Sequence, residues 1–318
     1  MDQANQKKLG NYKILLCGGN GFIGKNLSRL LAEQAEIIVA GRNLPPNDCD
    51  KKIHCATVDF NDLLQVKELL KTYQPDIIIN LIAQVTAERS LSLFPSMLET
   101  NLNPLLTLYE ASTVCTSLRL VIQIGSLEEY GDIPVPFREE QREQPASPYA
   151  LSKQLATNTA MMLHRNFNFP TVVLRLANLF GPHQASNKLI PYLVTQLLKN
   201  SDIALTSGEQ KREFLYVDRL AEIIKSVIEQ PDSFIGQILN LGSSVSYSIK
   251  EIALACKAYL NSSSNIVFGA LPDRPNEMPD MRCSSNKFFQ LSGHKIRDTF
   301  LSDLKNFLTT HSFTKETS

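Results

Sequence analysis

The chain has 318 residues, of which 43% are apolar and 20% are charged, and it carries 32 basic and 32 acidic side chains. At roughly 150 residues per domain, this length predicts about two structural units. The zero net charge argues against nucleic-acid binding through a broad basic face, and the apolar content excludes a wholly disordered chain. A polar N-terminus and the lack of a long apolar run predict a cytoplasmic protein that makes no membrane contact. Six cysteines without a C-x-x-C pair predict reduced thiols, and no metal site is expected because no histidine stands at ligand spacing.

Short apolar runs alternate with helical patterns through the first half of the chain. Strands are expected over residues 12–17, 36–41, 53–60, 75–83, 118–125 and 171–178. Helices are expected over residues 22–34 and 62–73, and another should end near Cys115. Such alternation is typical of a doubly wound parallel sheet with helices on both faces.

The pattern becomes less regular after Gly181. Helices are expected over residues 188–200, 218–230, 248–261 and 297–310, with apolar runs at 203–206 and 236–241 between them. We therefore predict an α/β Rossmann-type fold with a smaller, interleaved C-terminal substrate lobe. The expected division is a dinucleotide-binding domain of residues 1–175, completed by about 213–243, and a lobe of residues 176–212 and 244–318.

A glycine-rich loop separates the first predicted strand from the first helix. The spacing of Gly18, Gly21 and Gly24 is G-x-x-G-x-x-G, which lets the backbone turn tightly and approach a pyrophosphate. Amides at the start of the following helix then hold the anion. A plain strand–helix turn is the alternative. The predicted cofactor contacts in this loop are Gly18, Asn20, Gly21, Phe22, Ile23 and Gly24.

The end of the second predicted strand bears on the choice of dinucleotide. An NAD site usually has a carboxylate there, about 20 residues beyond the loop, to bind the ribose 2′-hydroxyl. This chain has Gly41-Arg42-Asn43 instead. Arg42 is suited to pair with a 2′-phosphate, although a solvated loop arginine is the alternative. We therefore predict NADP as the cofactor, with NAD as the alternative.

Tyr149 and Lys153 form a candidate catalytic pair. Their i, i+4 spacing places both side chains on one face of a helix that starts near Ser147-Pro148. An ammonium beside the phenol is expected to lower its pKa and make it usable for proton transfer. Ser126, just past a predicted strand, is expected to hydrogen-bond the substrate oxygen.

Taken in order, these motifs resemble the extended short-chain dehydrogenases/reductases, and within them the NAD-dependent epimerase/dehydratase family that acts on nucleotide sugars. The matching features are GGNGFIG, Asp59 in VDF, residues 81–84 (LIAQ), Asn101, Ser126, Tyr149 with Lys153, RLANLFGP (175–182) and REFLYVD (212–218). The resemblance implies a homodimer through residues 94–115 and 148–165. It implies cofactor contacts from Asp59, Phe60, Leu81, Ala83, Gln84, Asn101, Tyr149 and Lys153, and substrate contacts from Ser126, Asn178, Lys188 and Arg212.

Several of these residues also have a purely structural alternative. Asp59 is well placed to cap the following helix, and Asn101 to bond backbone from inside a helix. Arg175 and Arg212 are alternatively surface ion pairs of little energetic weight. The mixed-charge run 138–143 is interpreted as a solvated loop without function.

The residues after Ser126 bear on the reaction class. Dehydratases similar to the dTDP-glucose enzyme have an Asp acid and a Glu base here, whereas this chain has Leu127 and Glu128. The string Gly-Ser-x-Glu-Glu-Tyr-Gly resembles GDP-4-keto-6-deoxymannose reductases, and later segments resemble 4-ketoreductases similar to CDP-abequose and paratose synthases.

The resemblance therefore implies reduction of a nucleoside-diphosphate-4-keto-6-deoxyhexose by NADPH, in deoxysugar biosynthesis. Tyr149 would donate the proton, Ser126 would bind the oxygen, and Lys153 would hold the tyrosine and the nicotinamide ribose, with Glu128 as a possible fourth catalytic residue. The alternatives are an NAD-retaining 4-epimerase or a dehydratase and, more remotely, a non-catalytic NADP-sensing regulator.

Overall fold

The centre of the molecule is a seven-stranded, all-parallel sheet with the strand order β11-β6-β5-β4-β1-β2-β3. The computed structural model describes residues 12–44, 52–86, 88–274 and 277–310. The strands of the sheet are β1 (Lys13–Cys17), β2 (Glu36–Gly41), β3 (Ile53–Thr57), β4 (Ile77–Asn80), β5 (Leu120–Ser126), β6 (Thr171–Leu176) and β11 (Ile238–Leu241). The predicted Rossmann-type α/β fold is confirmed.

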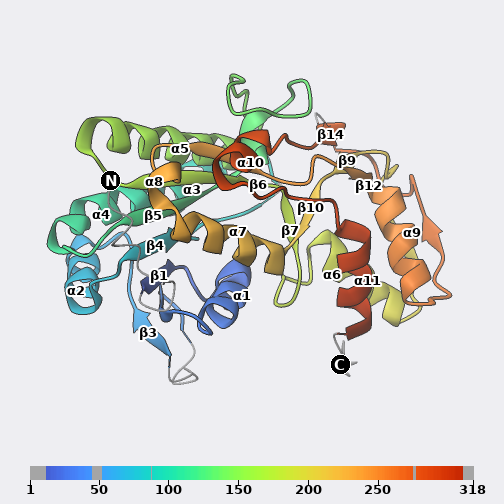
Figure 1. The fold of residues 1–318 in the computed structure, drawn as a ribbon. Helices are drawn as coiled ribbons and strands as arrows, with labels where there is room; N and C mark the ends of the chain where they lie inside the picture. The colour runs from blue at the N-terminus through green and yellow to red at the C-terminus, as the bar shows by residue number, and fades with distance from the viewer. Residues whose placement is uncertain (1–11, 45–51, 87, 275–276, 311–318) are drawn as a thin grey trace.

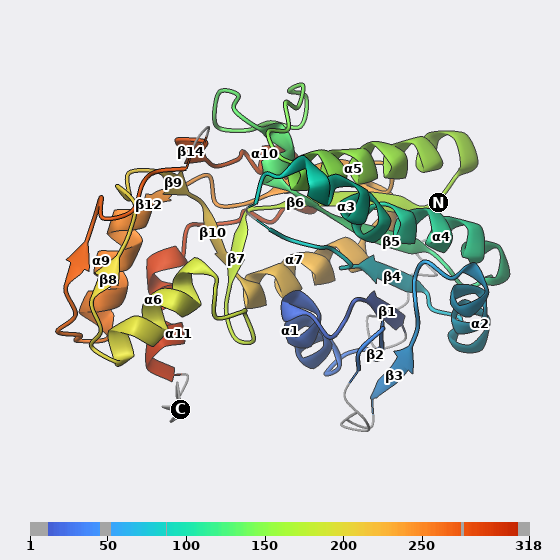
Figure 2. The same cartoon turned by 180° about the vertical axis from the view of Figure 1, so that it is seen from behind.

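Helices cover both faces of the sheet (Figures 1 and 2). Because side chains alternate along a strand, Ile14 and Leu16 of β1 enter one core and Leu15 and Cys17 enter the other. The first core is closed by α1 (Phe22–Leu31) and α7 (Val217–Glu229), and the second by α2 (Leu63–Tyr73), α4 (Asn103–Ala111) and α5 (Pro148–Phe167). The helix α3 (Phe94–Asn101) packs against α5. Short 3₁₀ helices in the described residues include η2 (Leu91–Leu93), η3 (Ser112–Val114) and η4 (Leu127–Tyr130).

The strand order reverses at β1, which has β2 on one side and β4 on the other. In an open parallel sheet, ligands bind in the crevice at the carboxyl ends of the strands where this reversal occurs. The loop after β1, the segment after β4 and the end of β5 all lie at this edge. The predicted cofactor loop and Ser126 therefore come together although more than 100 residues separate them in the sequence.

The smaller lobe lies beyond β6 and is built on three short sheets (Figure 1). Its strands are β7 (Asn178–Phe180) with β10 (Phe214–Tyr216), β8 (Ile203–Ala204) with β13 (Ile266–Val267), and β9 (Lys211–Arg212) between β12 (Tyr247–Ser248) and β14 (Asp280–Met281). Its helices are α6 (Leu189–Leu198), α9 (Ile249–Tyr259) and α11 (Phe300–Thr310). Aromatic rings form its core, with Phe180 and Phe214 each 5.4 Å from Phe300 between ring centroids.

The chain returns to the large sheet near its C-terminal end. The short helix α8 (Pro231–Phe234) precedes β11, and α10 (Asn286–Ser292) packs against both. Phe288 of α10 is fully buried in the core of the seven-stranded sheet. We propose the division into residues 1–175 with 213–243 and a substrate lobe of the remainder, with α10 attached to the first unit.

The cysteines differ in burial and in chemical state. Cys17, Cys115, Cys256 and Cys283 are free and buried, whereas Cys55 on the edge strand β3 is exposed and disulfide-bonded. The expectation of reduced thiols therefore does not hold for Cys55.

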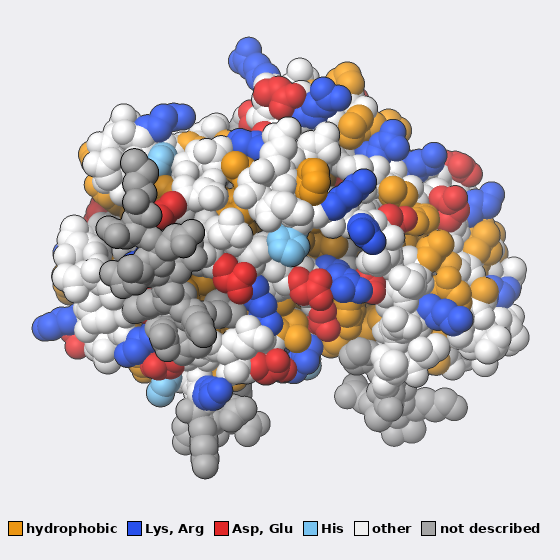
Figure 3. All heavy atoms as spheres, viewed as in Figure 1, with side chains coloured by type: hydrophobic (Ala, Val, Ile, Leu, Met, Phe, Trp, Pro, Cys, Tyr) orange, Lys and Arg blue, Asp and Glu red, His pale blue; other side chains and the backbone are white. Residues whose placement is uncertain are grey.

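Figure 3 shows basic and acidic side chains interspersed over one face of the molecule, as expected from their equal totals. Across the described part of the chain, every helix is too short or too polar to pass through a bilayer.

Candidate active site

The glycine loop has the backbone geometry that a bound pyrophosphate requires. Gly18 has a φ of +75°, and its N–H donates to the carbonyl of Ala40 at 2.7 Å. A Cβ on Gly24 would overlap the backbone of Gly19, so only glycine allows α1 to start this close to β1. Gly21 is the N-cap of α1 and provides no side-chain cap, which leaves the first-turn amides available to an anion. These residues fit a dinucleotide.

The loop after β2 lies against the glycine loop. Asn20 donates its side-chain N–H to the carbonyl of Asn43 at 2.6 Å, so Asn20 orders this loop in addition to its predicted cofactor contact. Arg42 is exposed directly after β2, in the position expected for an adenosine-ribose contact.

The segment that follows β3 shows which aspartate caps α2. Asp62, and not Asp59, caps α2, because its Oδ1 accepts the N–H groups of Leu64 and Gln65 at 2.9 and 3.2 Å. Asp59 instead accepts the N–H of Asn61 at 3.0 Å. Phe60, the other predicted adenine contact, is 4% exposed.

Asn101 connects the segment after β4 to α5, the helix that carries Tyr149 and Lys153. Its Oδ1 accepts the N–H of Gln84 at 2.7 Å, and its Nδ2 donates to Ser152 Oγ at 2.8 Å. Ser152 Oγ in turn donates to the carbonyl of Tyr149 at 2.8 Å. The buried amide thus bonds both backbone and side chain, and the segment of Leu81, Ala83 and Gln84 is held beside α5.

Ser126, Tyr149 and Lys153 meet at the junction of β5 and α5. Ser147 caps α5 by accepting the N–H of Ala150 at 3.1 Å, and Pro148 occupies the first turn. The Ser126 hydroxyl faces the Tyr149 phenol and favours its ionised form, and Lys153 Nζ donates to the carbonyl of Ile124 at 2.5 Å. All three candidate catalytic side chains therefore occupy one region.

The ionisation of this pair differs from the sequence-based expectation. Burial, with the charges of Glu128 and Glu129, raises the pKa of Tyr149 and outweighs the hydrogen bond from Ser126. Burial also lowers the pKa of Lys153 to about 8, against the opposing charge of Glu129. The net pKa of Tyr149 is therefore raised and not lowered as expected, because desolvation of the phenolate dominates.

A cavity of about 680 Å³ lies beside the Tyr149–Lys153 pair, between the sheet and the smaller lobe. Glu128, two residues after Ser126, and Ser147, two before Tyr149, both line it. Three predicted substrate residues also line it, namely Asn178, Lys188 and Arg212. Arg212 is held in place by Glu277 at 2.7 Å and by the carbonyl of Met278 at 2.9 Å, so it is not a surface ion pair.

The charges in the cavity surround Glu128. Burial raises the pKa of its carboxyl group, and the charges of Arg212, Arg89, Lys188 and Arg274 oppose that rise. Sequence reasoning missed Arg89 and Arg274, because each lies in a loop without a periodic pattern.

Leu127, between Ser126 and Glu128, is enclosed by apolar side chains. It is 1% exposed and packs with Tyr130, Phe137 and Met281 in a small apolar cluster. The position at which dehydratases are expected to carry an acid is therefore apolar and enclosed here.

Two further expectations are corrected by the buried arginine of β6. Arg175 is not a surface ion pair, because it is fully buried and bonds Glu129 and Glu143. The run 138–143 is not wholly solvated, since Glu139 and Glu143 turn inward to Asn240 and Arg175. The described residues hold no group of three or more His, Cys, Asp or Glu side chains arranged to bind a metal ion.

The sheet reversal, the glycine loop and the Ser–Tyr–Lys cluster together define a dinucleotide-dependent oxidoreductase fold and site. Residues 14–242 match the NAD dependent epimerase/dehydratase family, and the chain belongs to that family. It is accordingly an enzyme of the oxidoreductase type, which disfavours the non-catalytic regulator.

Individual proteins of this family are similar over most of the chain. A probable dTDP-glucose 4,6-dehydratase of Sinorhizobium fredii is 27% identical over 238 residues, which cover 69% of this chain and 68% of the relative. The structure of dTDP-glucose 4,6-dehydratase from Bacillus anthracis in complex with NAD superposes with a TM-score of 0.82, at 22% identity over 93% of this chain and 95% of that chain. UDP-glucose 4-epimerase from Thermotoga maritima with UDP-glucose gives 0.84, at 20% identity over 93% and 97%. These structural likenesses establish the fold, and the 4-ketoreductase resemblance stays a prediction.

Proposed function

We propose that the protein transfers hydride at C4 of a nucleoside-diphosphate hexose, with Tyr149 exchanging the proton of the C4 oxygen. The observation that carries this proposal is that Ser126 faces Tyr149 next to a cavity, which their chain neighbours Glu128 and Ser147 line. A bound nicotinamide dinucleotide supplies or accepts the hydride. Ser126 holds the oxygen, and Lys153 in its charged form holds the nicotinamide ribose.

The charges of the cavity support a nucleotide sugar as the substrate. A diphosphate needs cationic and hydrogen-bonding partners, and Arg89, Lys188, Arg212 and Arg274 bring four cations to a cavity that Asn178 also lines. The predicted roles of Asn178, Lys188 and Arg212 in binding this substrate remain part of the proposal.

Among the possible reaction classes, a redox-neutral conversion with a retained cofactor has the better support, because the similar proteins named above are dehydratases and an epimerase. Elimination of the C6 hydroxyl needs an acid, and the enclosed Leu127 cannot provide one. Epimerisation at C4 is therefore the first candidate, because it uses only Ser126, Tyr149 and Lys153.

The second candidate is reduction of a 4-keto-6-deoxy sugar by NADPH. It is favoured by Arg42 at the end of β2, where a carboxylate would prefer NAD. NADP is the cofactor proposed for this reaction, and NAD is the one proposed for the epimerase.

One experiment separates the two reactions. The purified protein is incubated with UDP- and dTDP-hexoses, and separately with 4-keto-6-deoxy nucleotide sugars plus NADPH, while products and NADPH absorbance are followed. Conversion of a plain hexose without net absorbance change supports the epimerase. Stoichiometric NADPH loss with the keto sugar supports the reductase, and inactivity with every nucleotide sugar would contradict both.

Two further expectations stay proposals. We propose a homodimer through residues 94–115 and 148–165, and Phe167, just after the second range, is 55% exposed. Light scattering of the purified protein tests this assembly. A cytoplasmic location likewise stays a prediction, which fractionation of cells that produce the protein tests.

A further inference from the structure

Next to Glu128, which faces the cavity, Glu129 faces the interior of the protein. It is fully buried, and each of its carboxylate oxygens has a different partner. Oε1 accepts the backbone N–H of Ser126 at 2.8 Å, and Oε2 accepts Nε–H of Arg175 at 2.8 Å. Ser126 Oγ also accepts the N–H of Glu128, and Ser126 and Glu129 together form a reciprocal capping box at the start of η4. The carboxylate therefore determines where the Ser126 backbone lies.

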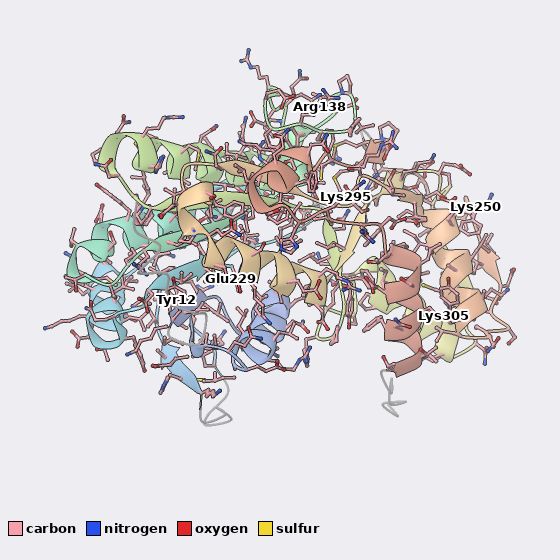
Figure 4. The ribbon with its side chains drawn as sticks, viewed as in Figure 1. Tyr12, Arg138, Glu229, Lys250, Lys295 and Lys305 are labelled. Atoms are coloured by element: carbon pink, nitrogen blue, oxygen red, sulfur yellow. The ribbon has the colours of Figure 1, made fainter. Side chains whose placement is uncertain are left out.

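Arg175 extends this contact toward the catalytic helix. Its guanidinium lies 4.6 Å from the centre of the Tyr130 ring, and Nη2 donates to Glu143. Glu143 belongs to the loop of residues 131–147, which runs from η4 to the N-cap of α5 and projects from the body of the molecule, where Figure 4 labels Arg138. One buried arginine thus joins the strand end that carries Ser126 to the loop that leads into Tyr149.

A second set of bonds fixes the same loop to the sheet. Glu139 accepts the N–H of Asn240 on β11 at 2.8 Å, and Tyr130 donates its hydroxyl proton to Asn240 Oδ1 at 2.9 Å. Asn240 Nδ2 donates to the carbonyl of Phe137 at 3.2 Å. The loop is therefore anchored at several points by buried polar groups, which is costly unless each is satisfied.

Glu129 acts on the reaction centre through its charge as well as through its hydrogen bonds. The charged groups of this region are Glu129, which acts on both Lys153 and Tyr149, and Glu128, which acts on Tyr149. Of these, Glu129 supplies the charge that opposes the loss of the Lys153 proton on burial. A buried ion pair is weak evidence for net stability, so a role in organising the site explains these charges better than a role in stability alone.

We propose that Glu129, held by Arg175, which in turn bonds Glu143, is a positioning residue that fixes Ser126 against Tyr149 and sets its negative charge near Lys153. This inference rests on the proposed function only for the identity of the reaction. Glu129 touches neither cavity nor reacting atoms, and it acts through Ser126 and Lys153.

The kinetic test compares Glu129→Gln with Glu140→Gln, an exposed carboxylate of the same loop. Small displacements of a reacting group cost on the order of 10²-fold in rate, so kcat of Glu129→Gln should fall about 10- to 100-fold while KM for the nucleotide sugar stays nearly constant. The basic limb of its pH–rate profile should move to lower pH, because Lys153 loses its proton earlier. Glu140→Gln should match the wild type. A Glu129→Gln enzyme with wild-type kcat and pH profile, or one altered only in thermal stability, overturns the proposal.

A substrate-free measurement separates this inference from the proposed function. In protein labelled with ¹³C at lysine Cε, the Lys153 resonance is assigned with Lys153→Arg and titrated by NMR. The pKa of Lys153 should be lower in Glu129→Gln than in the wild type and unchanged in Glu140→Gln. Equal Lys153 titration in all three overturns the proposal, even if the reaction turns out to be another one.

If Glu129→Gln does not fold, a second variant tests the same proposal. Glu129→Leu combined with Arg175→Met removes both charges at once, and apolar replacement of a whole buried pair is often tolerated. The folded double variant should show the same loss of kcat and the same lowered Lys153 pKa. Wild-type values for both would overturn the proposal.

Discussion

The two halves of the site at the carboxyl edge of the sheet are built by different means. The cofactor half, after β1 and β2, consists of glycine backbone and helix amides, with the charged Arg42 exposed at its rim. The reaction half, after β5 and β6, places the charged groups Glu129, Lys153 and Arg175 in the interior. The backbone geometry of the first half depends on positions where a Cβ would not fit. The arrangement of the second half depends on how its buried charges are paired. Substitutions should therefore fail for different reasons in the two halves.

The largest effect is expected from Tyr149→Phe in the reaction half. Loss of a positioned proton donor costs about 10²- to 10⁴-fold in turnover. Cofactor affinity should stay nearly intact, since the glycine loop and Lys153 are unchanged. Steady-state kinetics and a cofactor titration measure both, and a variant that keeps more than about a tenth of wild-type turnover would show that Tyr149 is not the acid.

In the cofactor half, Arg42→Ala should reduce a preference for NADPH over NADH. A charge-assisted hydrogen bond contributes about 1.5–3 kcal/mol, or roughly 10- to 150-fold in affinity. Dissociation constants for both dinucleotides, with Asn43→Ala as the control on the same exposed loop, test this. Equal affinity of the wild type for both cofactors would instead support the NAD-retaining epimerase.

A steric prediction contrasts two glycines of the same loop. In Gly24→Ala the new Cβ overlaps the Gly19 backbone, so we expect a destabilisation of about 1–3 kcal/mol and weaker cofactor binding. In Gly21→Ala the nearest heavy atom is the Gly18 carbonyl oxygen at 3.3 Å, and the effect should be smaller. Urea unfolding ranks the two variants, and the reverse order would refute the steric argument.

The pH dependence tests the buried lysine. Lys153 with a pKa of about 8 is charged below that pH and neutral above it. Activity that needs its charge should therefore be full on the acid side and fall as the pH rises through about 8. The phenol of Tyr149, whose pKa is raised, stays protonated over the same interval. A pH–rate profile that stays flat well above that pH would show that the Lys153 charge is not required.

The smallest effect is expected from Glu128→Gln. In an epimerase or a reductase this carboxylate abstracts no C5 proton, so the rate should change only modestly. In a dehydratase it would serve as the base, and its loss would cost about 10²-fold or more. A loss of that size, with redox-neutral conversion of a plain hexose, would establish elimination despite Leu127.

Local patterns were sufficient to predict the sheet and the two main motifs. Apolar runs and glycine spacing are properties of a few neighbouring residues. The strands, the G-x-x-G-x-x-G loop and the Tyr149–Lys153 pair can therefore be recognised from the sequence alone. The cap of α2 can likewise be recognised locally, because Asp62 immediately precedes the helix.

Only the tertiary structure decided the environment of each charge. Glu128 and Glu129 are identical neighbours in the sequence, yet one lines the cavity and the other is enclosed with Arg175, 46 residues away. The pKa directions of Tyr149 and Lys153 follow from burial by β5, η4 and α5 together, which no local pattern contains. Side-chain type and spacing are encoded locally, whereas desolvation and ion pairing depend on which distant segments close around a group, and for that reason the chemistry of this site required the fold.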